Sequence, residues 1–261
     1  MSVPMLEAEG LGAAYRKKSV LAGINIAVHG GELAVLIGPN GSGKTTLLKT
    51  LGGLLPRNSG EIRLDGRKLH EYTRRERASR LAYLFQDAGT PWSFTVKECI
   101  AQGRFFRQGW FGGENAGDRQ AVEGAIEAAG LGGFQERPVH ELSGGEYQRV
   151  LIARAVAQEA SCLLLDEPAA NLDLKYQYRM MELLKTLVKE KGRAVLVSLH
   201  ELGLAGLYAD TIIVLDKGRI AAQGKPGHIL TGELLNRVFE LPVSGNGLYK
   251  GVPCLPPYRE E

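Results

Sequence analysis

The chain has 261 residues, of which 44% are hydrophobic and 23% are charged, a composition typical of a globular protein with a sizeable core. Its 32 Lys and Arg residues nearly balance its 29 Asp and Glu residues, and the resulting net charge of +3 argues against a nucleic-acid partner. Three widely spaced cysteines predict no disulfide framework, and no charge-free stretch is long and apolar enough to predict a membrane span.

Short apolar runs rich in Val, Ile and Leu recur along the chain and predict β-strands. These runs are 24–28, 33–37, 61–64, 81–85, 162–166, 194–198 and 211–215. Helical periodicity separates several of them, at 45–51, 147–158, 177–189 and 201–208. The alternation predicts an α/β fold with a mixed, mainly parallel sheet. Closer strand spacing before about residue 35 and the turns HGGE and LDGRK predict an antiparallel β flank.

Strand signals vanish between about residues 87 and 160, where helical patterns dominate around a glycine-rich stretch at 109–117. We interpret this region as a helical lobe inserted into a core formed by 1–86 and 161–241. Residues 1–241 are therefore expected to form a single domain. The tail, residues 242–261, is so rich in Gly and Pro that it predicts no regular elements.

The sequence GPNGSGKTT, residues 38–46, follows the predicted strand 33–37 and precedes a predicted helix. It fits the G-x-x-x-x-G-K-[ST] phosphate-loop pattern, which an accidental glycine-rich turn rarely matches in this context. Its small residues let backbone N–H groups converge on phosphate oxygens, Lys44 adds a positive charge, and Thr45 offers a hydroxyl to Mg²⁺. We therefore predict a triphosphate site made by Gly38, Pro39, Asn40, Gly41, Ser42, Gly43, Lys44, Thr45 and Thr46.

The apolar run CLLL ends in Asp166 and Glu167 and is stopped by Pro168. Acids at the carboxyl end of a parallel strand lie where such sheets bind phosphates. Asp166 is expected to hold Mg²⁺ through water, and Glu167 to orient or deprotonate the attacking water. Read alone, the pair fits a strand-end cap with a solvated neighbour. Beside a phosphate loop, it predicts nucleotide hydrolysis.

The motif LSGGEYQR, residues 142–149, contains Ser143 and Glu146 at capping-box spacing, which predicts a helix that begins at Gly144. Gly144 and Gly145 cost about 1 kcal/mol each relative to Ala in a helix, so something other than helix stability accounts for them. Exposed N–H groups here would form a second anion-binding helix start. An ordinary cap is the alternative. Two phosphate-receptive helix starts need two ligands, or one ligand shared between two copies.

In their order and spacing these motifs resemble the ATP-binding cassette (ABC) family over nearly the whole chain. In that family LSGGE is the signature motif, and a head-to-tail dimer closes on two ATP molecules. The resemblance implies catalytic roles for Lys44, Glu167 and His200, adenine stacking on Tyr15, and a Mg²⁺ site near Thr45, Gln86 and Asp166. It implies contacts to the ATP of the second copy from Ser143, Gly144, Gly145 and Asp173.

Three of these residues are ambiguous when taken singly. Tyr15 could equally be a packing aromatic. Gln86 and His200 could each be a polar residue at the end of a strand. Their joint order with the other motifs supports the resemblance.

One cassette without a membrane span resembles the separate ATPase subunit of a bacterial-type transporter. The resemblance implies a peripheral position on the cytoplasmic face of the cell membrane, with a second copy, two transmembrane permease subunits and, indirectly, a substrate-binding protein. TVKECIAQGR, NLDLKYQ and the segment 224–243 are similar to ATPases of importers for iron-siderophores, haem and cobalamin. PAANLD and the insertion at 109–117 depart from the pattern, so the cargo stays open.

The alternatives divide by class. A zinc or manganese importer is the nearest neighbouring interpretation. An exporter shares every motif, and only the resemblance of the tail and the lobe disfavours it. ABC ATPases of DNA repair or ribosomes usually carry two cassettes or long coiled-coil insertions, and this sequence shows neither. An unrelated phosphate-loop kinase would need a phosphate acceptor, whereas the cassette needs only water.

Overall fold

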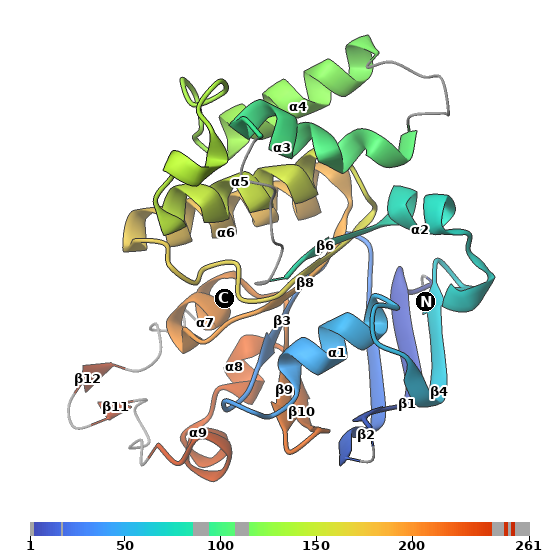
Figure 1. Ribbon diagram of the computed structural model, residues 1–261. Helices are drawn as coiled ribbons and strands as arrows, with labels where there is room; N and C mark the ends of the chain where they lie inside the picture. Colours follow the sequence, from blue (N-terminus) through green and yellow to red (C-terminus); the bar gives the residue numbers. More distant parts are fainter. Residues whose placement is uncertain are drawn as a thin grey trace.

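The computed structural model describes residues 3–16, 18–85, 94–107 and 115–241, together with the backbone of 248–249 and 252–253. Figure 1 shows a central sheet with a group of helices, α3 to α6, along one side of it. On the other side lie α1 and a second sheet that contains β1, β2 and β4. Within the described residues, no helix is both long and apolar enough to cross a bilayer.

The central sheet has six strands in the order β10-β9-β3-β8-β7-β6. The strands are β3 (Leu33–Ile37), β6 (Leu81–Leu84), β7 (Cys162–Leu165), β8 (Ala194–Ser198), β9 (Thr211–Asp216) and β10 (Arg219–Gly224). All neighbours pair in parallel except β9 and β10, which are antiparallel. Because β3, β7 and β8 are buried along their whole length, they read as apolar runs without alternation. The predicted mixed, mainly parallel sheet is confirmed.

The second sheet has the order β2-β1-β4-β5 and is antiparallel throughout. Its strands are β1 (Leu6–Tyr15), β2 (Lys18–Val28), β4 (Arg57–Leu64) and β5 (Arg67–Lys68). Helix α1 (Lys44–Leu51) lies between the two sheets, and its leucines share one apolar cluster with β1, β2, β3 and β8. The predicted antiparallel flank is confirmed. The segment before α1 lies between the two sheets.

The helices on the opposite side of the central sheet include α3 (Val96–Ala101), α4 (Ala116–Ala128) and α5 (Gly144–Ala157), with the short turns η2 (Gln102–Arg107) and η3 (Val139–Glu141). They enclose an apolar cluster of their own. Helix α5 serves two clusters, because Val150 and Ala153 face α3 and α4 whereas Leu151 and Ile152 face the central sheet. A buried ion pair of 2.9 Å between Arg104 and Asp118 ties η2 to α4.

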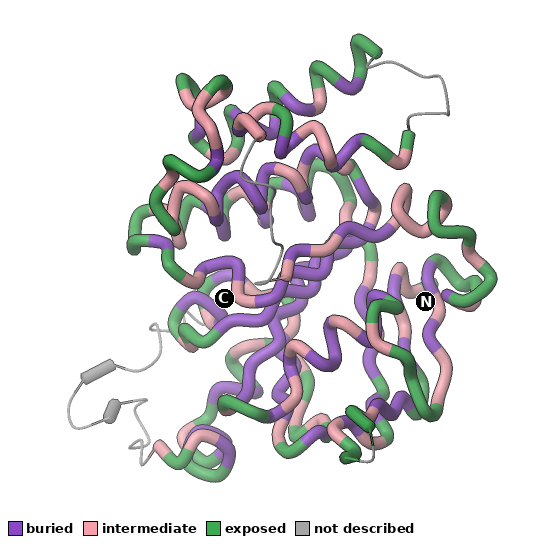
Figure 2. The backbone as a smooth tube through the Cα atoms, viewed as in Figure 1, coloured by how far each residue is buried: buried purple, intermediate pink, exposed green. Residues whose placement is uncertain are grey.

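The remaining helices are α2 (Arg74–Arg80), α6 (Leu174–Lys191), α7 (Leu202–Tyr208), α8 (Pro226–Ile229) and α9 (Gly232–Phe239), with the turn η1 (Leu69–Glu71). The tail contributes two short antiparallel strands, β11 (Leu248–Tyr249) and β12 (Val252–Pro253), where the sequence predicted no element. Figure 2 shows that buried residues concentrate in the central sheet and along α5, whereas α2 is largely exposed or half-buried.

Candidate functional site

The phosphate loop, residues 38–43, leaves the buried end of β3 and enters α1 through Gly43. Gly43 has a φ of 108°, a conformation that favours glycine. Gly38 lies directly against the end of β9, so that a Cβ there would be 2.1 Å from the carbonyl oxygen of Leu215. In the turn that follows β9, the backbone N–H of Gly218 donates to the carbonyl of Ser42, at 3.0 Å. Tertiary contacts therefore fix the shape of the loop.

Gly38→Ala is expected to lower the free energy of unfolding by about 2–3 kcal/mol, because the new Cβ would overlap a backbone carbonyl that cannot rotate away. Urea denaturation of the purified protein measures the change. Gly203→Ala is the matched control, since a Cβ at Gly203 meets nothing within 4 Å, and it should leave stability unchanged or slightly higher. Equal midpoints for Gly38→Ala and the parent would show that the loop tolerates displacement from β9.

Lys44 is the first residue of α1, and its side chain lies back across the loop. Its Nζ donates to the carbonyls of Gly38 at 2.8 Å and Pro39 at 3.3 Å. Burial lowers the pKa of Lys44, and the nearby carboxylates of Glu167 and Asp166 oppose that shift. The structure therefore brings the lysine and both predicted acids into one electrostatic site.

Asp166 and Glu167 follow β7, and β8 ends beside them because the two strands are parallel neighbours. Asp166 is 1% exposed, and its Oδ1 accepts from the hydroxyl of Ser198 at 2.7 Å. The backbone N–H of Glu167 donates to that same hydroxyl at 2.9 Å. Ser198 thus orients the carboxylate of Asp166 and the backbone of Glu167. Ser198 was not among the residues predicted from the sequence, although a serine that ends an otherwise apolar strand is a usable signal.

His200 comes two residues after β8, and its Nε2 lies 2.5 Å from Oε1 of Glu167. Glu167 has a φ of 48°, in the left-handed region that a non-glycine residue rarely occupies. Such strain persists where surrounding contacts fix the backbone, and it is frequent at functional sites. The carboxylate and the imidazole therefore form a pair at the edge of the sheet where the phosphate loop also lies.

The N-terminus of α5 shows the capping box that the sequence predicted. Glu146 N–H donates to the hydroxyl of Ser143 at 3.3 Å, and Ser143 N–H donates to Oε2 of Glu146 at 2.8 Å. Ser143 and Gly144 are exposed, and a Cβ on Gly144 would meet no atom within 4 Å. Gly145 is different, because a Cβ there would lie 2.9 Å from the carbonyl oxygen of Asn171. Only Gly144 therefore leaves open space at the helix start.

Asp173 is the N-cap of α6, where its carboxylate accepts from the backbone N–H of Tyr176 at 3.0 Å. Tyr15 ends β1 and is 47% exposed, so its side chain is accessible to a ligand. Thr45 lies in the first turn of α1 and is half-buried. Gln86 lies outside the described residues. No cluster of three or more His, Cys, Asp or Glu side chains fit for a metal occurs in the described part of the chain.

Comparison with known proteins places these motifs in context. The family model described as ABC transporter matches residues 21–170. Ferric enterobactin transport ATP-binding protein FepC of Escherichia coli (strain K12) is 39% identical, over 95% of this chain and 94% of its own. Hemin import ATP-binding protein HmuV of Rhodococcus jostii (strain RHA1) is 42% identical, over 91% of this chain and 80% of its own.

The fold is similar to that of a solved ATP-binding cassette, MJ0796, a dimer in a post-hydrolysis state bound to ADP and Pi. The TM-score is 0.78 at 28% identity, and the match covers 85% of this chain and 99% of that chain. The sequence relatives and the solved structure therefore agree on one family.

Proposed function

The chain belongs to the ABC transporter family, and from this premise we propose that it is the ATP-hydrolysing subunit of an importer for a metal chelate. Its relatives are named for ferric enterobactin and hemin, which points to chelated iron as the cargo class. The observation that supports the hydrolytic role best is the grouping of Lys44 with Asp166, Glu167 and His200 at one edge of the central sheet.

In this proposal, residues 38–46 bind the phosphates of ATP, and Tyr15 stacks on the adenine. Lys44 exchanges its two loop carbonyls for phosphoryl oxygens, where its charge stabilises the transition state. Glu167 orients and deprotonates the attacking water, and His200 holds the Glu167 carboxylate and approaches the γ-phosphate. Ser198 keeps Asp166 and the Glu167 backbone in place during this step.

Oxygen donors of Thr45, Gln86 and Asp166 would hold Mg²⁺, which when bound would neutralise charge on the phosphoryl oxygens. Mg²⁺ usually keeps several waters and is bound through one or two carboxylates together with substrate phosphates. The buried Asp166 is held in one orientation by Ser198. This fixed carboxylate is the part of the proposed metal site that the protein preorganises.

Ser143, Gly144, Gly145 and Asp173 complete the site of a second copy in this proposal. The exposed, capped start of α5 supports it, because open backbone N–H groups at a helix start attract phosphate. The dimeric cassette to which the chain is similar supports a second copy as well. We further propose that the dimer docks on two transmembrane permease subunits at the cytoplasmic face of the membrane and, through them, serves a substrate-binding protein.

Reconstitution tests the transport assignment. The protein is purified with its permease, inserted in proteoliposomes and given a metal-chelate-binding protein, Mg-ATP and radioactive iron as a siderophore complex or as haem. We expect inward accumulation of iron that EDTA abolishes, with the γ-phosphoryl group transferred to water and no other acceptor required. Accumulation of free Zn²⁺ or Mn²⁺ instead, or outward movement of the chelate, would contradict metal-chelate import while leaving the ATPase role intact.

A further inference from the structure

The first two turns of α5 are fixed to the segment 168–176, which leads into α6. Gly145 lies against the carbonyl of Asn171, because a Cβ added to this glycine would be only 2.9 Å from the carbonyl oxygen. Nε2 of Gln148 donates to the carbonyl of Pro168 at 3.2 Å. The guanidinium carbon of Arg149 is 4.2 Å from the ring centroid of Tyr176. The segment that carries Ser143 and the segment that carries Asp173 therefore contact each other along two helical turns.

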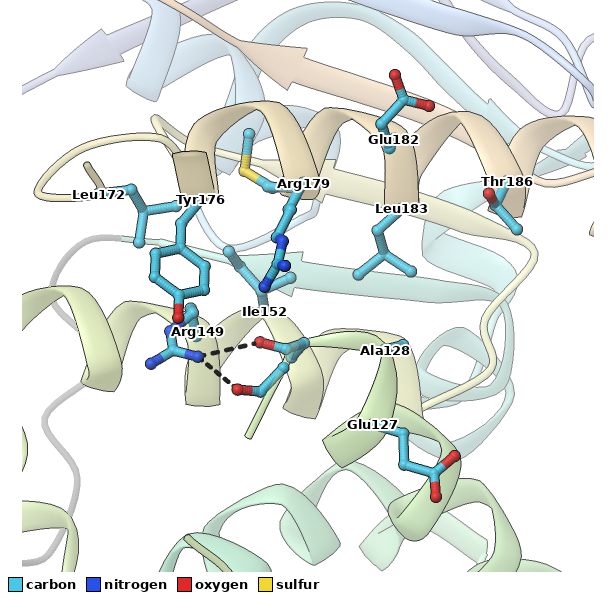
Figure 3. A pocket seen from close by; sticks show the side chains of 13 residues that line it. Glu127, Ala128, Arg149, Ile152, Leu172, Tyr176, Arg179, Glu182, Leu183 and Thr186 are labelled. Atoms are coloured by element: carbon cyan, nitrogen blue, oxygen red, sulfur yellow. Dashed lines mark hydrogen bonds between the residues drawn. The ribbon is translucent and has the colours of Figure 1, made fainter. Parts of the chain in front are cut away.

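Arg149 is the residue that extends this contact to a third element. Its side chain is 7% exposed, and its Nη1 donates to the carbonyls of Gly130 at 2.6 Å and Ala129 at 3.4 Å, just after α4. A cation at the C-terminal end of a helix also meets the negative end of the helix dipole. Arg149 thus joins α4, α5 and α6 through one planar group, as Figure 3 shows.

A cavity of about 370 Å³ lies beside this stack, between α6 and the end of α4. Figure 3 shows Tyr176, Arg179 and Leu183 pointing from α6 toward Ile152 and the end of α4. Because side chains do not fill this space, close packing does not fix the distance between α4 and α6 there. The contact between Arg149 and Tyr176 at the edge of the cavity is therefore important for the position of α6 relative to α4.

Tyr176 also connects the stack to the cap of α6. Its backbone N–H donates to the Asp173 carboxylate at 3.0 Å, while its ring carries the guanidinium of Arg149. A shift of the ring would therefore move the same helical turn that orients Asp173. Ser143 lies two turns from Arg149 at the other end of the capped segment of α5.

We propose that Arg149 and Tyr176 are positioning residues that hold Ser143–Gly145 and Asp173 in one fixed orientation, so that both reach the ATP of a second copy together. The inference rests on the shared site of the proposed function. A misplacement of about 1 Å between groups that act on one ligand can cost up to about a hundredfold in rate. Removal of a desolvated cation–π contact should therefore lower kcat and the affinity of dimerisation by about tenfold each.

The test compares Tyr176→Leu with Tyr176→Phe in the full-length protein. Tyr176→Leu should lower kcat about tenfold and weaken ATP-driven dimerisation by a similar factor, while the affinity of the monomer for a fluorescent ATP analogue stays unchanged. Tyr176→Phe keeps the ring and should behave as the parent. Arg179→Ala is the matched control, because Arg179 faces the same ring at a longer distance of 5.6 Å, whereas the hydrogen bonds found to the end of α4 come from Arg149.

Arg149→Gln should reproduce Tyr176→Leu, and if Arg149→Gln does not fold, the Tyr176 pair still decides. Equal kcat and dimerisation for Tyr176→Leu and Tyr176→Phe would overturn the positioning role, even with a lower melting temperature. The positioning role would also be overturned if the Tyr176→Leu monomer lost affinity for nucleotide by the same factor as it lost kcat. If Gly144→Asp blocks dimerisation and Tyr176→Leu does not, only the positioning proposal fails. If neither does, the shared site itself is wrong.

Discussion

Glu167→Gln should lower the rate of ATP hydrolysis at least about a hundredfold, because the amide cannot accept a proton from the attacking water. The substitution keeps the size of the side chain and an oxygen for the 2.5 Å contact with His200. ATP binding through residues 38–46 should therefore persist. Since hydrolysis is what opens the proposed dimer, the variant should accumulate as an ATP-bound dimer. Phosphate release measures the rate, and analytical ultracentrifugation with ATP measures the dimer.

Glu182→Gln is the matched control for this change. Glu182 lies on α6 and accepts a hydrogen bond of 2.7 Å from the hydroxyl of Tyr208, so the same isosteric substitution loses a charge away from the proposed site. It should hydrolyse ATP at the parental rate. A Glu167→Gln protein that also kept the parental rate would remove Glu167 from the role of base. It would leave Lys44 and Asp166 as the groups that stabilise the transition state.

The parts of the site that the sequence predicted depend on local geometry or on burial of whole strands. The cap of α5 is local, because Ser143 and Glu146 are three residues apart and satisfy each other's backbone N–H groups. The runs at β3, β7 and β8 are buried on both faces. Such strands are apolar almost throughout, as β8 is up to Ser198, so their positions and the mainly parallel character of the sheet were predictable from the sequence.

The parts that sequence reasoning missed depend on contacts between distant segments. Ser198 reaches Asp166 across 32 positions, and Arg149 meets Tyr176 only because α5 and α6 pack side by side. The sequence did not predict β1 as a separate strand. Three register shifts interrupt its pairing with β2 and break the alternation of apolar residues. Pairing across the fold decides these features, and one sequence does not reveal it.

Gly144→Asp should abolish ATP-driven dimerisation without lowering the stability of the monomer. A Cβ at Gly144 meets no atom within 4 Å, and an acid in the first turn of a helix is favourable by about 0.3–1 kcal/mol. Replacing glycine in a helix also helps. In the proposed dimer, however, the carboxylate would face the γ-phosphate of the second copy's ATP. Repulsion between these two negative charges, in a site that excludes water, should lower the affinity of dimerisation at least about a hundredfold.

Two further variants separate charge from shape. Gly144→Ala makes the same backbone change without a charge, and it should dimerise much better than Gly144→Asp. Gly132→Asp adds a carboxylate at another exposed glycine with nothing within 4 Å of its Cβ, and it should dimerise as the parent. Urea denaturation and sedimentation with ATP give stability and dimerisation for each protein. If Gly144→Asp dimerises normally, the open start of α5 faces solvent throughout the ATPase cycle, and Gly144 needs another explanation.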